Sequence, residues 1–423
     1  MRQDDPIEGV LAVAEHRLLS WSREGHLELW DARTGTMIGP GTSTGSRLNG
    51  ALAIKDGKIL TWSQDNSLRL WDVAAGTQIG PSMNHDSNVI GALKMPDGHI
   101  LSWSDDRTLR LWDAVAGRPL LPPMHHEDVV LGAQLNPEGQ IVSWSKDNTL
   151  RLWNPSSGIQ SNPTLRRYSN DWFKGMQLLP DGRVLTWSQD GILEVWELSG
   201  DSSRALNRND EHPVNGAVVM PDNHILSWSK DYTVRLWDVD TGLQVGPSMS
   251  HEGPVNGALV MPDGHILSWS DDHTLRLWDP NTGVQIGPSM RHDGPVTGAL
   301  VNSDGRILSW SEDKTLRLWD PGIGQQIGPS MVHDAAVASA LVMPNGRVLS
   351  WAGDTIKVWN TSWPKGNLFE LACALLPDVA LADTSMSIGI KIAEPICQEP
   401  SKILSIDWDA LISTDRESGI GER

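Results

Sequence analysis

The chain has little of several residue types that would point to a fold or a function. Its 423 residues include 2 cysteines, 2 phenylalanines and 2 tyrosines. Two cysteines give no disulfide framework in a chain of this length, which fits a reducing compartment. No apolar run approaches the length of a membrane span, and the acidic start MRQDDPIEG lacks the apolar core of a signal peptide. We therefore expect a soluble cytoplasmic protein.

Basic residues are also scarce relative to acidic ones. The chain has 34 Lys and Arg against 53 Asp and Glu, which gives a formal net charge of −19. Nucleic acids and anionic membranes are both bound chiefly through clustered lysine and arginine. Neither is expected as the main partner, whereas a basic or neutral protein surface remains possible.

Tryptophan, by contrast, is abundant, with 21 copies. Nine of them recur in steps of 40 to 43 residues, and most are followed by Asp. These anchor positions are Trp30, Trp71, Trp112, Trp153, Trp196, Trp237, Trp278, Trp319 and Trp359. The spacing shows that most of the chain consists of copies of one unit.

Within a unit, apolar residues alternate with polar ones between clusters of turn residues. This pattern predicts four antiparallel strands joined by hairpins. In the copy that ends at Met331, we expect Asp304-Gly305 to supply the positive-φ pair of a tight hairpin turn. Gly328-Pro329 should lie on the outer edge strand, because proline cannot donate to a ladder on both sides. The strands are predicted at 299–301, 306–311, 315–319 and 326–331.

A period of about 40 to 45 residues with four strands per unit is typical of a propeller blade. The repeats resemble those of the WD-repeat β-propeller family over roughly residues 7 to 360. The resemblance implies an all-β fold, with one propeller of nine four-stranded antiparallel blades and eight blades as the alternative. We expect the propeller at 7–360, a mixed helix and strand extension that closes or caps it at 361–412, and a disordered tail at 413–423. The extension weakly resembles those of some bacterial WD-repeat proteins.

The ninth unit has three recognisable strands, so closing the ring needs a fourth. An open blade would leave an unpaired edge that invites aggregation. The segment from Met1 to Pro6 is too short and polar to serve well. We predict that the segment from Ile403 to Trp408 supplies the missing outer strand.

In the family, each well-formed blade is held by a hydrogen-bonded chain of His, Asp, Ser or Thr, and the anchor Trp. The resemblance places four such chains here: His85, Ser102, Asp106 and Trp112; His126, Ser143, Asp147 and Trp153; His251, Ser268, Asp272 and Trp278; and His292, Ser309, Asp313 and Trp319. In the other units we expect Ser169 and Asp210 to replace the His, and Gly353 to replace the Asp.

A His beside an Asp and a Ser also matches a catalytic triad. A nucleophile is needed once, however, whereas this trio recurs around the ring with its hydroxyl facing an indole. No GxxxxGK phosphate loop and no metal-ligand spacing is present. We interpret the trios as structural and expect no enzymatic activity, no cofactor and no metal.

Every unit also contains a second Trp, which the family commonly replaces with a small residue. We predict that these side chains fill the wedges between neighbouring blades. The alternative is a lectin-like propeller in which repeated Trp-lined sites stack against sugars. The nine positions are Trp21, Trp62, Trp103, Trp144, Trp187, Trp228, Trp269, Trp310 and Trp351.

The predicted function is a non-catalytic scaffold or sensor platform for protein–protein interaction. In the family, partners commonly dock on the face that carries the loops before the first strand and between the second and third strands. The candidate rim residues there are Gln64, Asp105, Lys146, Lys230, Asp271 and Glu312, together with Tyr168 and Trp172 of the divergent fifth unit. Because this rim is mostly acidic, we expect a partner with a basic segment. The propeller is expected to be monomeric, alone or within a larger signalling assembly.

Overall fold

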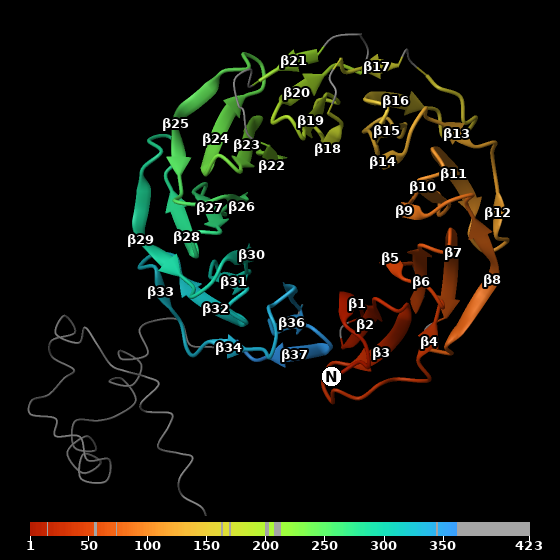
Figure 1. Ribbon diagram of the computed structural model, residues 1–423, viewed down its shortest axis with the longest axis horizontal. Helices are drawn as coiled ribbons and strands as arrows, with labels where there is room; N and C mark the ends of the chain where they lie inside the picture. The colour runs from red at the N-terminus through yellow and green to blue at the C-terminus, as the bar shows by residue number, and fades with distance from the viewer. Residues whose placement is uncertain are drawn as a thin grey trace, which may run out of the picture. The chain divides into compact units, whose positions relative to one another are not determined.

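The computed structural model describes residues 1–361 except 15, 55–56, 73, 162–163, 169–170, 199–202, 207–212 and 344–345. Met1–Gln326 and Ser330–Asn360 form one compact unit. In it, nine small antiparallel sheets follow one another around a ring, which makes a nine-bladed β-propeller (Figure 1). The all-β prediction is confirmed, with nine blades rather than eight. The predicted C-terminal extension and tail lie outside the described residues.

The first three blades take up the N-terminal third of the ring. Blade 1 contains β1 (Ile7–Ala14), β2 (Arg17–Ser22), β3 (His26–Asp31) and β4 (Thr42–Ser43). Blade 2 contains β5 (Leu48–Ala53), β6 (Lys58–Ser63), β7 (Ser67–Asp72) and β8 (Thr77–Asn84). Blade 3 contains β9 (Val89–Lys94), β10 (Ile100–Ser104), β11 (Thr108–Asp113), β12 (Arg118–Pro119) and β13 (Met124–His125).

The next three blades continue in the same order. Blade 4 contains β14 (Val130–Leu135), β15 (Ile141–Ser145), β16 (Thr149–Trp153) and β17 (Leu165–Arg166). Blade 5 contains β18 (Phe173–Leu178), β19 (Val184–Ser188), β20 (Leu193–Trp196) and β21 (Ser203–Ala205). Blade 6 contains β22 (Val214–Val219), β23 (His224–Ser229), β24 (Thr233–Asp238) and β25 (Gln244–Ser250).

The last three blades lead back to the first. Blade 7 contains β26 (Val255–Val260), β27 (Ile266–Ser270), β28 (Thr274–Trp278) and β29 (Gln285–Arg291). Blade 8 contains β30 (Val296–Val301), β31 (Ile307–Ser311), β32 (Thr315–Asp320), β33 (Gln325–Gln326) and β34 (Met331–Val332). Blade 9 contains β35 (Ser339–Val342), β36 (Val348–Ala352) and β37 (Thr355–Trp359).

In each blade the first strand lies nearest the centre of the ring, and the fourth strands, such as β8, β25 and β29, lie on the circumference (Figure 1). The predicted outer edge is therefore confirmed. In blade 8 the predicted strand at 326–331 is divided into β33 and β34, which pair with opposite ends of β32. In blades 2, 6 and 7 the corresponding Gly-Pro lies inside one fourth strand, at an irregularity in its pairing with the third strand.

The turn between the first and second strands differs from the prediction. Gly305 has a φ of 86°, but Asp304 is not in the left-handed region. The N–H of Gly305 donates to the carbonyl of Asn302 over 3.0 Å, which closes a four-residue turn. Met95 to Gly98 form the same turn in blade 3, with proline second and glycine fourth, as a type I turn favours. Only the glycine of this turn needs a positive φ.

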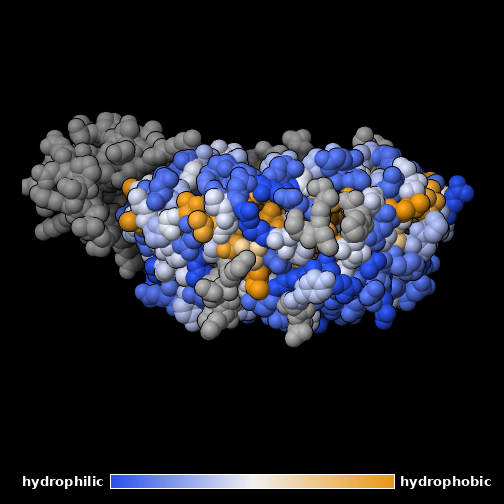
Figure 2. Space-filling model, turned by 90° about the horizontal axis from the view of Figure 1, so that it is seen from above, coloured by the Kyte–Doolittle hydropathy of each residue, from blue (hydrophilic) through white to orange (hydrophobic). Residues whose placement is uncertain are grey.

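The hydrophobic core lies between the blades and consists of separate clusters. In one cluster Leu101 and Met124 of blade 3 pack against Val130 and Trp153 of blade 4. Another cluster contains Leu18 of blade 1 together with buried apolar residues of blade 9, so hydrophobic packing closes the ring. Because apolar side chains are buried in this way, the propeller seen edge-on is mostly hydrophilic, with small separate hydrophobic areas (Figure 2). In the described part of the chain, no helix has the length and apolar character needed to cross a membrane.

The N-terminal residues pair with the last blade, contrary to the prediction that they would not. Arg2 forms an antiparallel bridge with Thr355 at the start of β37. The N–H of Ile356 donates to the carbonyl of Met1, and the N–H of Gln3 donates to the carbonyl of Asp354, each over 2.9 Å. Three residues suffice, because main-chain hydrogen bonds do not depend on side-chain polarity. The candidate closing segment Ile403 to Trp408 lies outside the described residues.

We predict that Gln3→Pro destabilises the propeller by about 1–3 kcal/mol, because it removes the N–H that donates to Asp354. Thermal unfolding followed by circular dichroism measures the effect. Gln3→Ala is the matched control, because both variants lose the buried Gln3 side chain and only Gln3→Pro also loses the N–H that donates to Asp354. Equal melting temperatures for the two variants would show that this pairing does not stabilise the closure.

Candidate functional site

One hydrogen bond recurs in all nine blades. The indole Nε1–H of the anchor Trp on the third strand donates to a Ser or Thr hydroxyl on the second strand, over 2.7 to 2.9 Å. In blade 5, for example, Trp196 donates to Thr186. These hydroxyls are buried in every blade. Each bond therefore joins two strands of one blade in the interior, where an unpaired indole N–H would be costly.

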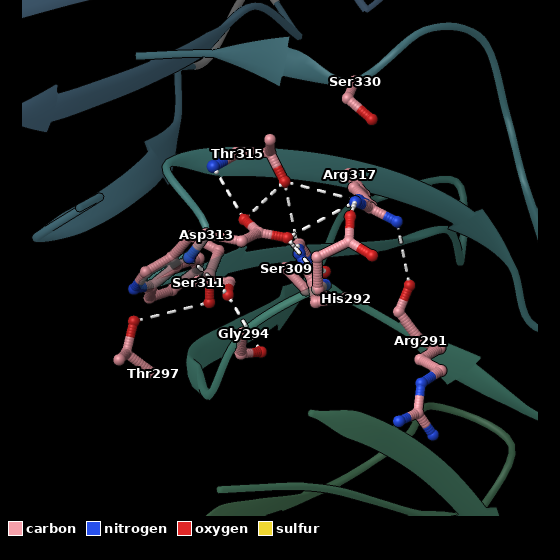
Figure 3. Close-up of polar contacts among 12 residues, drawn as sticks. Arg291, His292, Gly294, Thr297, Ser309, Ser311, Asp313, Thr315, Arg317 and Ser330 are labelled. Carbon is pink, nitrogen blue, oxygen red and sulfur yellow. Dashed lines mark hydrogen bonds and ion pairs between the residues drawn. The ribbon is translucent and has the colours of Figure 1, made fainter. Parts of the chain in front are cut away.

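In blade 8 this bond extends into a longer chain of contacts (Figure 3). Nε2 of His292 lies 2.7 Å from Oγ of Ser309, and Nδ1 of His292 lies 2.8 Å from Oδ2 of Asp313. The indole of Trp319 can only donate, so the Ser309 hydroxyl accepts from it and donates its own hydrogen to Nε2 of His292. The proton of His292 then lies on Nδ1 and is donated to Asp313.

Burial and hydrogen bonding set the charges along this chain. Burial lowers the pKa of His292 below its usual value, although Asp313 opposes the shift. Burial alone would raise the pKa of Asp313, but hydrogen bonds from Thr315, the Asp293 N–H and His292 lower it to about 2. Near neutral pH a neutral imidazole therefore donates to a carboxylate. The carboxylate of Asp313 accepts hydrogen bonds from Thr315 and a backbone N–H as well as from the imidazole.

The structure brings together all four of the predicted sets. The distances from His Nε2 to Ser Oγ are 2.7 Å in blades 3, 4 and 7 as well. Those from His Nδ1 to Asp Oδ2 are 2.8, 3.1 and 2.9 Å. Hydrogen bonds to His, Thr and backbone groups outweigh burial and hold the pKa values of Asp106, Asp147 and Asp272 well below the usual range.

The surroundings of these trios decide between a structural and a catalytic interpretation. Ser309 has no exposed area and His292 is 1% exposed. The Ser309 hydroxyl already accepts the indole proton of Trp319. A nucleophile must be able to reach a substrate, and a hydroxyl without exposed area cannot do so. The geometry favours the structural role.

Where the described residues place no His beside the Asp, an arginine lies close to the carboxylate. Asp65 of blade 2 lies 2.7 Å from the guanidinium of Arg69, and Asp231 of blade 6 lies 2.7 Å from that of Arg235. In the four blades that have the His, the corresponding Arg–Asp distances are 3.2 to 3.6 Å. Where the imidazole is missing, the arginine approaches and takes over part of its role.

In blade 5 the sequence prediction assigned the wrong residue to the His position. The N–H of Arg167 donates to the carbonyl of Asn148. The N–H of His126, which occupies the His position of blade 4, donates to the carbonyl of Arg107 in the same way. Arg167 is 5% exposed, and its guanidinium lies 2.5 Å from Asp190. Arg167 therefore occupies the position that was assigned to Ser169. A step of 41 residues from His126 was the available signal. Ser169 and Asp210 lie outside the described residues.

Blade 1 also has a member that the sequence prediction did not include. Gln3 is 2% exposed, and its Oε1 accepts from the Ser20 hydroxyl over 3.0 Å. Gln3 precedes Ser20 by 17 residues, the same interval as His85 before Ser102. The interval was the signal that could have identified Gln3.

Blade 9 has the His but, as predicted, Gly353 in place of the Asp. Nε2 of His333 lies 2.7 Å from Oγ of Ser350, while its buried Nδ1 has no hydrogen-bond partner among the described residues. Burial, with a smaller contribution from Lys357, lowers the pKa of His333 to about 4. His333 is therefore neutral at pH 7.

The second Trp of each blade packs against the inner strand and the neighbouring blade. Trp103 pairs with Gly91 across two strands, and a Cβ on that glycine would lie 2.3 Å from the Trp ring. The same close approach recurs at eight glycines: Gly9, Gly50, Gly91, Gly132, Gly175, Gly216, Gly257 and Gly298. Trp103 also packs on the cluster between blades 3 and 4.

The predicted rim residues lie together on one face. The loop between the second and third strands, the b–c loop, is bonded to the loop before the first strand, the entry loop. In blade 4, for example, the N–H of Lys146 donates to the carbonyl of Val129. The first b–c residues that make this bond are Arg23, Gln64, Asp105, Lys146, Gln189, Lys230, Asp271 and Glu312, with N–H to carbonyl distances of 2.9 to 3.3 Å. Tyr168 and Trp172 lie in the entry loop of blade 5.

Some acidic residues on this face already have cationic partners. Asp86 lies 2.5 Å from Arg110, and Asp293 lies 2.6 Å from Arg317. Asp271 and Glu312 are exposed, and the described residues place no cation in an ion pair with either. Nor do the described residues include a group of three or more His, Cys, Asp or Glu that could hold a metal ion. The acidic charge available to a partner is thus smaller than the sequence suggests.

The comparisons with known proteins agree with this geometry. Residues 245–279 and 287–320 match the family described as WD domain, G-beta repeat. Each match spans the fourth strand of one blade and the first three strands of the next. This protein is a WD-repeat β-propeller. The family model matches two repeats, and the structure contains nine sheets of this kind.

The other comparisons bear on the fold of this WD-repeat propeller. The crystal structure of the computationally designed Ika8 protein is similar, with a TM-score of 0.54 and 19% sequence identity. The likeness covers 85% of this chain and 97% of that one, and it concerns the fold alone. No curated protein matches the chain.

We predict that Asp272→Ala lowers the stability of the propeller by about 1–3 kcal/mol, because His251, Thr274 and the Glu252 N–H lose their acceptor. The melting temperature should fall, while the affinity of the folded protein for any partner stays the same. Asp240→Ala is the control, since this carboxylate is mostly exposed. Loss of a hydrolytic activity in a well-folded Asp272→Ala protein would instead support the triad.

We predict that His333→Gln makes stability less dependent on pH. His333 has a folded pKa of about 4 against an ordinary 6.5, so its contribution is complete above pH 6.5 and is lost as the pH falls toward 4. Glutamine at this position can still accept from Ser350, as Gln3 accepts from Ser20. Melting temperatures across that pH range should fall less steeply in the variant. His125→Gln is the control, since His125 is exposed. Parallel curves for wild type and His333→Gln would contradict the prediction.

Proposed function

We propose that this protein is a non-catalytic scaffold that binds a partner protein on the face formed by its entry and b–c loops. The proposal rests on the contrast between the hydrogen bonds that recur inside every blade and the side chains that differ from blade to blade on the loop-bearing face. The Trp to hydroxyl bond recurs in every blade, whereas the first b–c residue varies between Asp, Glu, Gln and Lys. A surface with a different side chain in each blade suits one extended partner better than many identical small ligands.

The charge of the face suggests the chemistry of a partner. Asp271 and Glu312 are exposed on adjacent blades, and Asp105 lies at the same position of blade 3. Carboxylates arranged in this way attract a basic segment and increase its rate of association. We propose such a segment as the ligand of blades 3, 7 and 8. The cysteine usage and acidic charge further suggest a cytoplasmic, monomeric propeller, on its own or within a larger signalling assembly.

The lectin-like alternative depends on the second Trp of each blade. A sugar platform needs one open ring face at each site. Here the ring of Trp62 lies against Gly50 and packs on the cluster between blades 2 and 3, and its Nε1–H donates to the carbonyl of Ile90. These contacts favour a packing role, so the protein scaffold is the better-supported proposal.

We predict that changing Asp105, Asp271 and Glu312 together to Lys weakens binding of a labelled lysine-rich peptide severalfold. Fluorescence anisotropy measures the affinity, which should also decrease as salt is added, since the Debye length is ~8 Å at physiological ionic strength. The fold should tolerate the change, because Lys146 and Lys230 occupy the same position in blades 4 and 6.

The control for this experiment makes the same change in charge on the opposite face. Asp97, Glu138 and Asp263 lie in turns at the other end of the second strand, so their joint replacement by Lys should leave binding unchanged. Equal affinity in the rim variant and the control would place the partner elsewhere on the propeller.

A further inference from the structure

Blades 4 to 6 depart from the acidic character of the loop-bearing face. At the first b–c position, Asp105, Asp271 and Glu312 of blades 3, 7 and 8 are acidic. Lys146 and Lys230 occupy the same position in blades 4 and 6, on either side of blade 5, and both are exposed. Arg23 is also basic at this position of blade 1, but blades 4 and 6 place two basic residues on either side of one blade.

A second position changes in the same sector. The residue before the inner-strand glycine is Lys174 in blade 5 and Asn215 in blade 6. Both side chains donate to a backbone carbonyl of the next blade, with Nζ of Lys174 lying 3.2 Å from O of Val214. Burial and the neighbouring Lys230 both lower the pKa of Lys174, so these two cationic groups influence each other.

The entry loop of blade 5 is a third point of departure. Arg167 and Phe173 are separated by two residues more than His126 and Val130 are in blade 4, so the loop is longer. Trp172 in this loop is 43% exposed, and Nζ of Lys146 lies 5.5 Å from the centre of its ring. Such a contact connects blades 4 and 5 at the surface.

Tyr168 in this loop replaces an acidic residue. The residue that directly follows the His position is otherwise acidic in five blades, at Asp86, Glu127, Glu252, Asp293 and Asp334. In blade 5 it is Tyr168, which is 94% exposed. A negative charge is thus lost where the neighbouring positions gain positive charge.

The arginines of this sector have anionic partners, whereas its lysines have none among the described residues. Arg167 is buried against Asp190, and Arg166 lies 3.7 Å from Glu127. In the part of the chain that the structure describes, Lys146, Lys174 and Lys230 form no ion pair. Three lysines without an ion pair among the described residues, one of them over the ring of Trp172, form a basic surface in a chain of net charge −19 and can attract an external anion.

We infer that this basic–aromatic patch, composed of Lys146, Tyr168, Trp172, Lys174 and Lys230, binds an acidic peptide segment of a partner protein. The lysines would receive carboxylates, and the two aromatic side chains would cover an apolar side chain between them. Tryptophan and tyrosine at the centre of a polar rim are the residue types that contribute most to protein interfaces. The inference rests on the proposed scaffold function but concerns other blades and a partner segment of opposite charge.

The surroundings of the patch favour a peptide over a nucleic acid. A single strand would also suit lysines and aromatic rings, but it continues with a phosphate at every nucleotide. Beyond the patch it would meet Asp105 and Asp271 on either side. A peptide can instead confine its carboxylates to a short segment, so its neutral flanks are not repelled.

The test measures binding of a labelled Glu- and Asp-rich peptide with one central Leu by fluorescence anisotropy at low salt. Lys146→Glu combined with Lys230→Glu should weaken binding about tenfold, since two attractive contacts become repulsive. Glutamate is compatible with the fold there, because Glu312 occupies this position in blade 8. Trp172→Val should weaken binding severalfold, and Val129 is its counterpart in blade 4.

The matched control carries Asp105→Lys, Asp271→Lys and Glu312→Lys. These three positions lie on the same face but outside the patch. This control variant should still bind the acidic peptide but should bind the lysine-rich peptide more weakly. Each of the two binding sites can then be impaired without the other. No binding by the wild type, or equal binding by wild type and both patch variants, would overturn the inference. Tighter binding of a short thymidine strand than of the acidic peptide would also overturn it, in favour of a nucleic acid.

Discussion

The interaction on which the propeller depends is the hydrogen bond from the anchor Trp to a buried hydroxyl. The bond connects the second and third strands of each blade, and the Trp ring then packs into the cluster that joins this blade to the one before it. A displaced Trp112, for example, would leave an unpaired polar hydrogen in the interior and a cavity between blades 2 and 3. The same residue thus connects strand pairing with ring assembly, which accounts for its presence in all nine blades.

The partners beyond that hydroxyl vary, and the variation follows chemistry. Ser20 donates to the amide oxygen of Gln3 in blade 1, whereas Ser309 donates to an imidazole nitrogen in blade 8. Where the imidazole is absent, as beside Asp65, an arginine approaches the carboxylate instead. In each case a buried hydroxyl or carboxylate has a partner of matching hydrogen-bonding capacity. Blade 9 is the exception, because Gly353 replaces the Asp there and the buried Nδ1 of His333 has no partner among the described residues.

Much of the fold could be predicted from the sequence, because the spacing of the anchor Trp fixes the length of a blade. The closure could not, since the pairing of Arg2 with Thr355 uses main-chain groups that every residue has. Arg167 was missed for another reason. The 43-residue step shows an insertion but not its place, and the structure puts the two additional residues after Arg167 rather than before it. The replacement of an acidic residue by Tyr168 became visible once Arg167 could be aligned with the His position by its hydrogen bond.

The loop-bearing face can differ from blade to blade because main-chain bonds hold its loops. The N–H of Lys146 and the N–H of Asp271 make equivalent bonds to the entry loops of their own blades, although the two side chains carry opposite charges. Because the side chain at this position takes no part in that bond, its charge can change at little cost to the fold. The additional residues in blade 5 extend the same principle from charge to loop length. A frame whose stability is separate from its surface can carry an acidic sector and a basic–aromatic one on the same face, and one partner or two could then be held by segments of opposite charge.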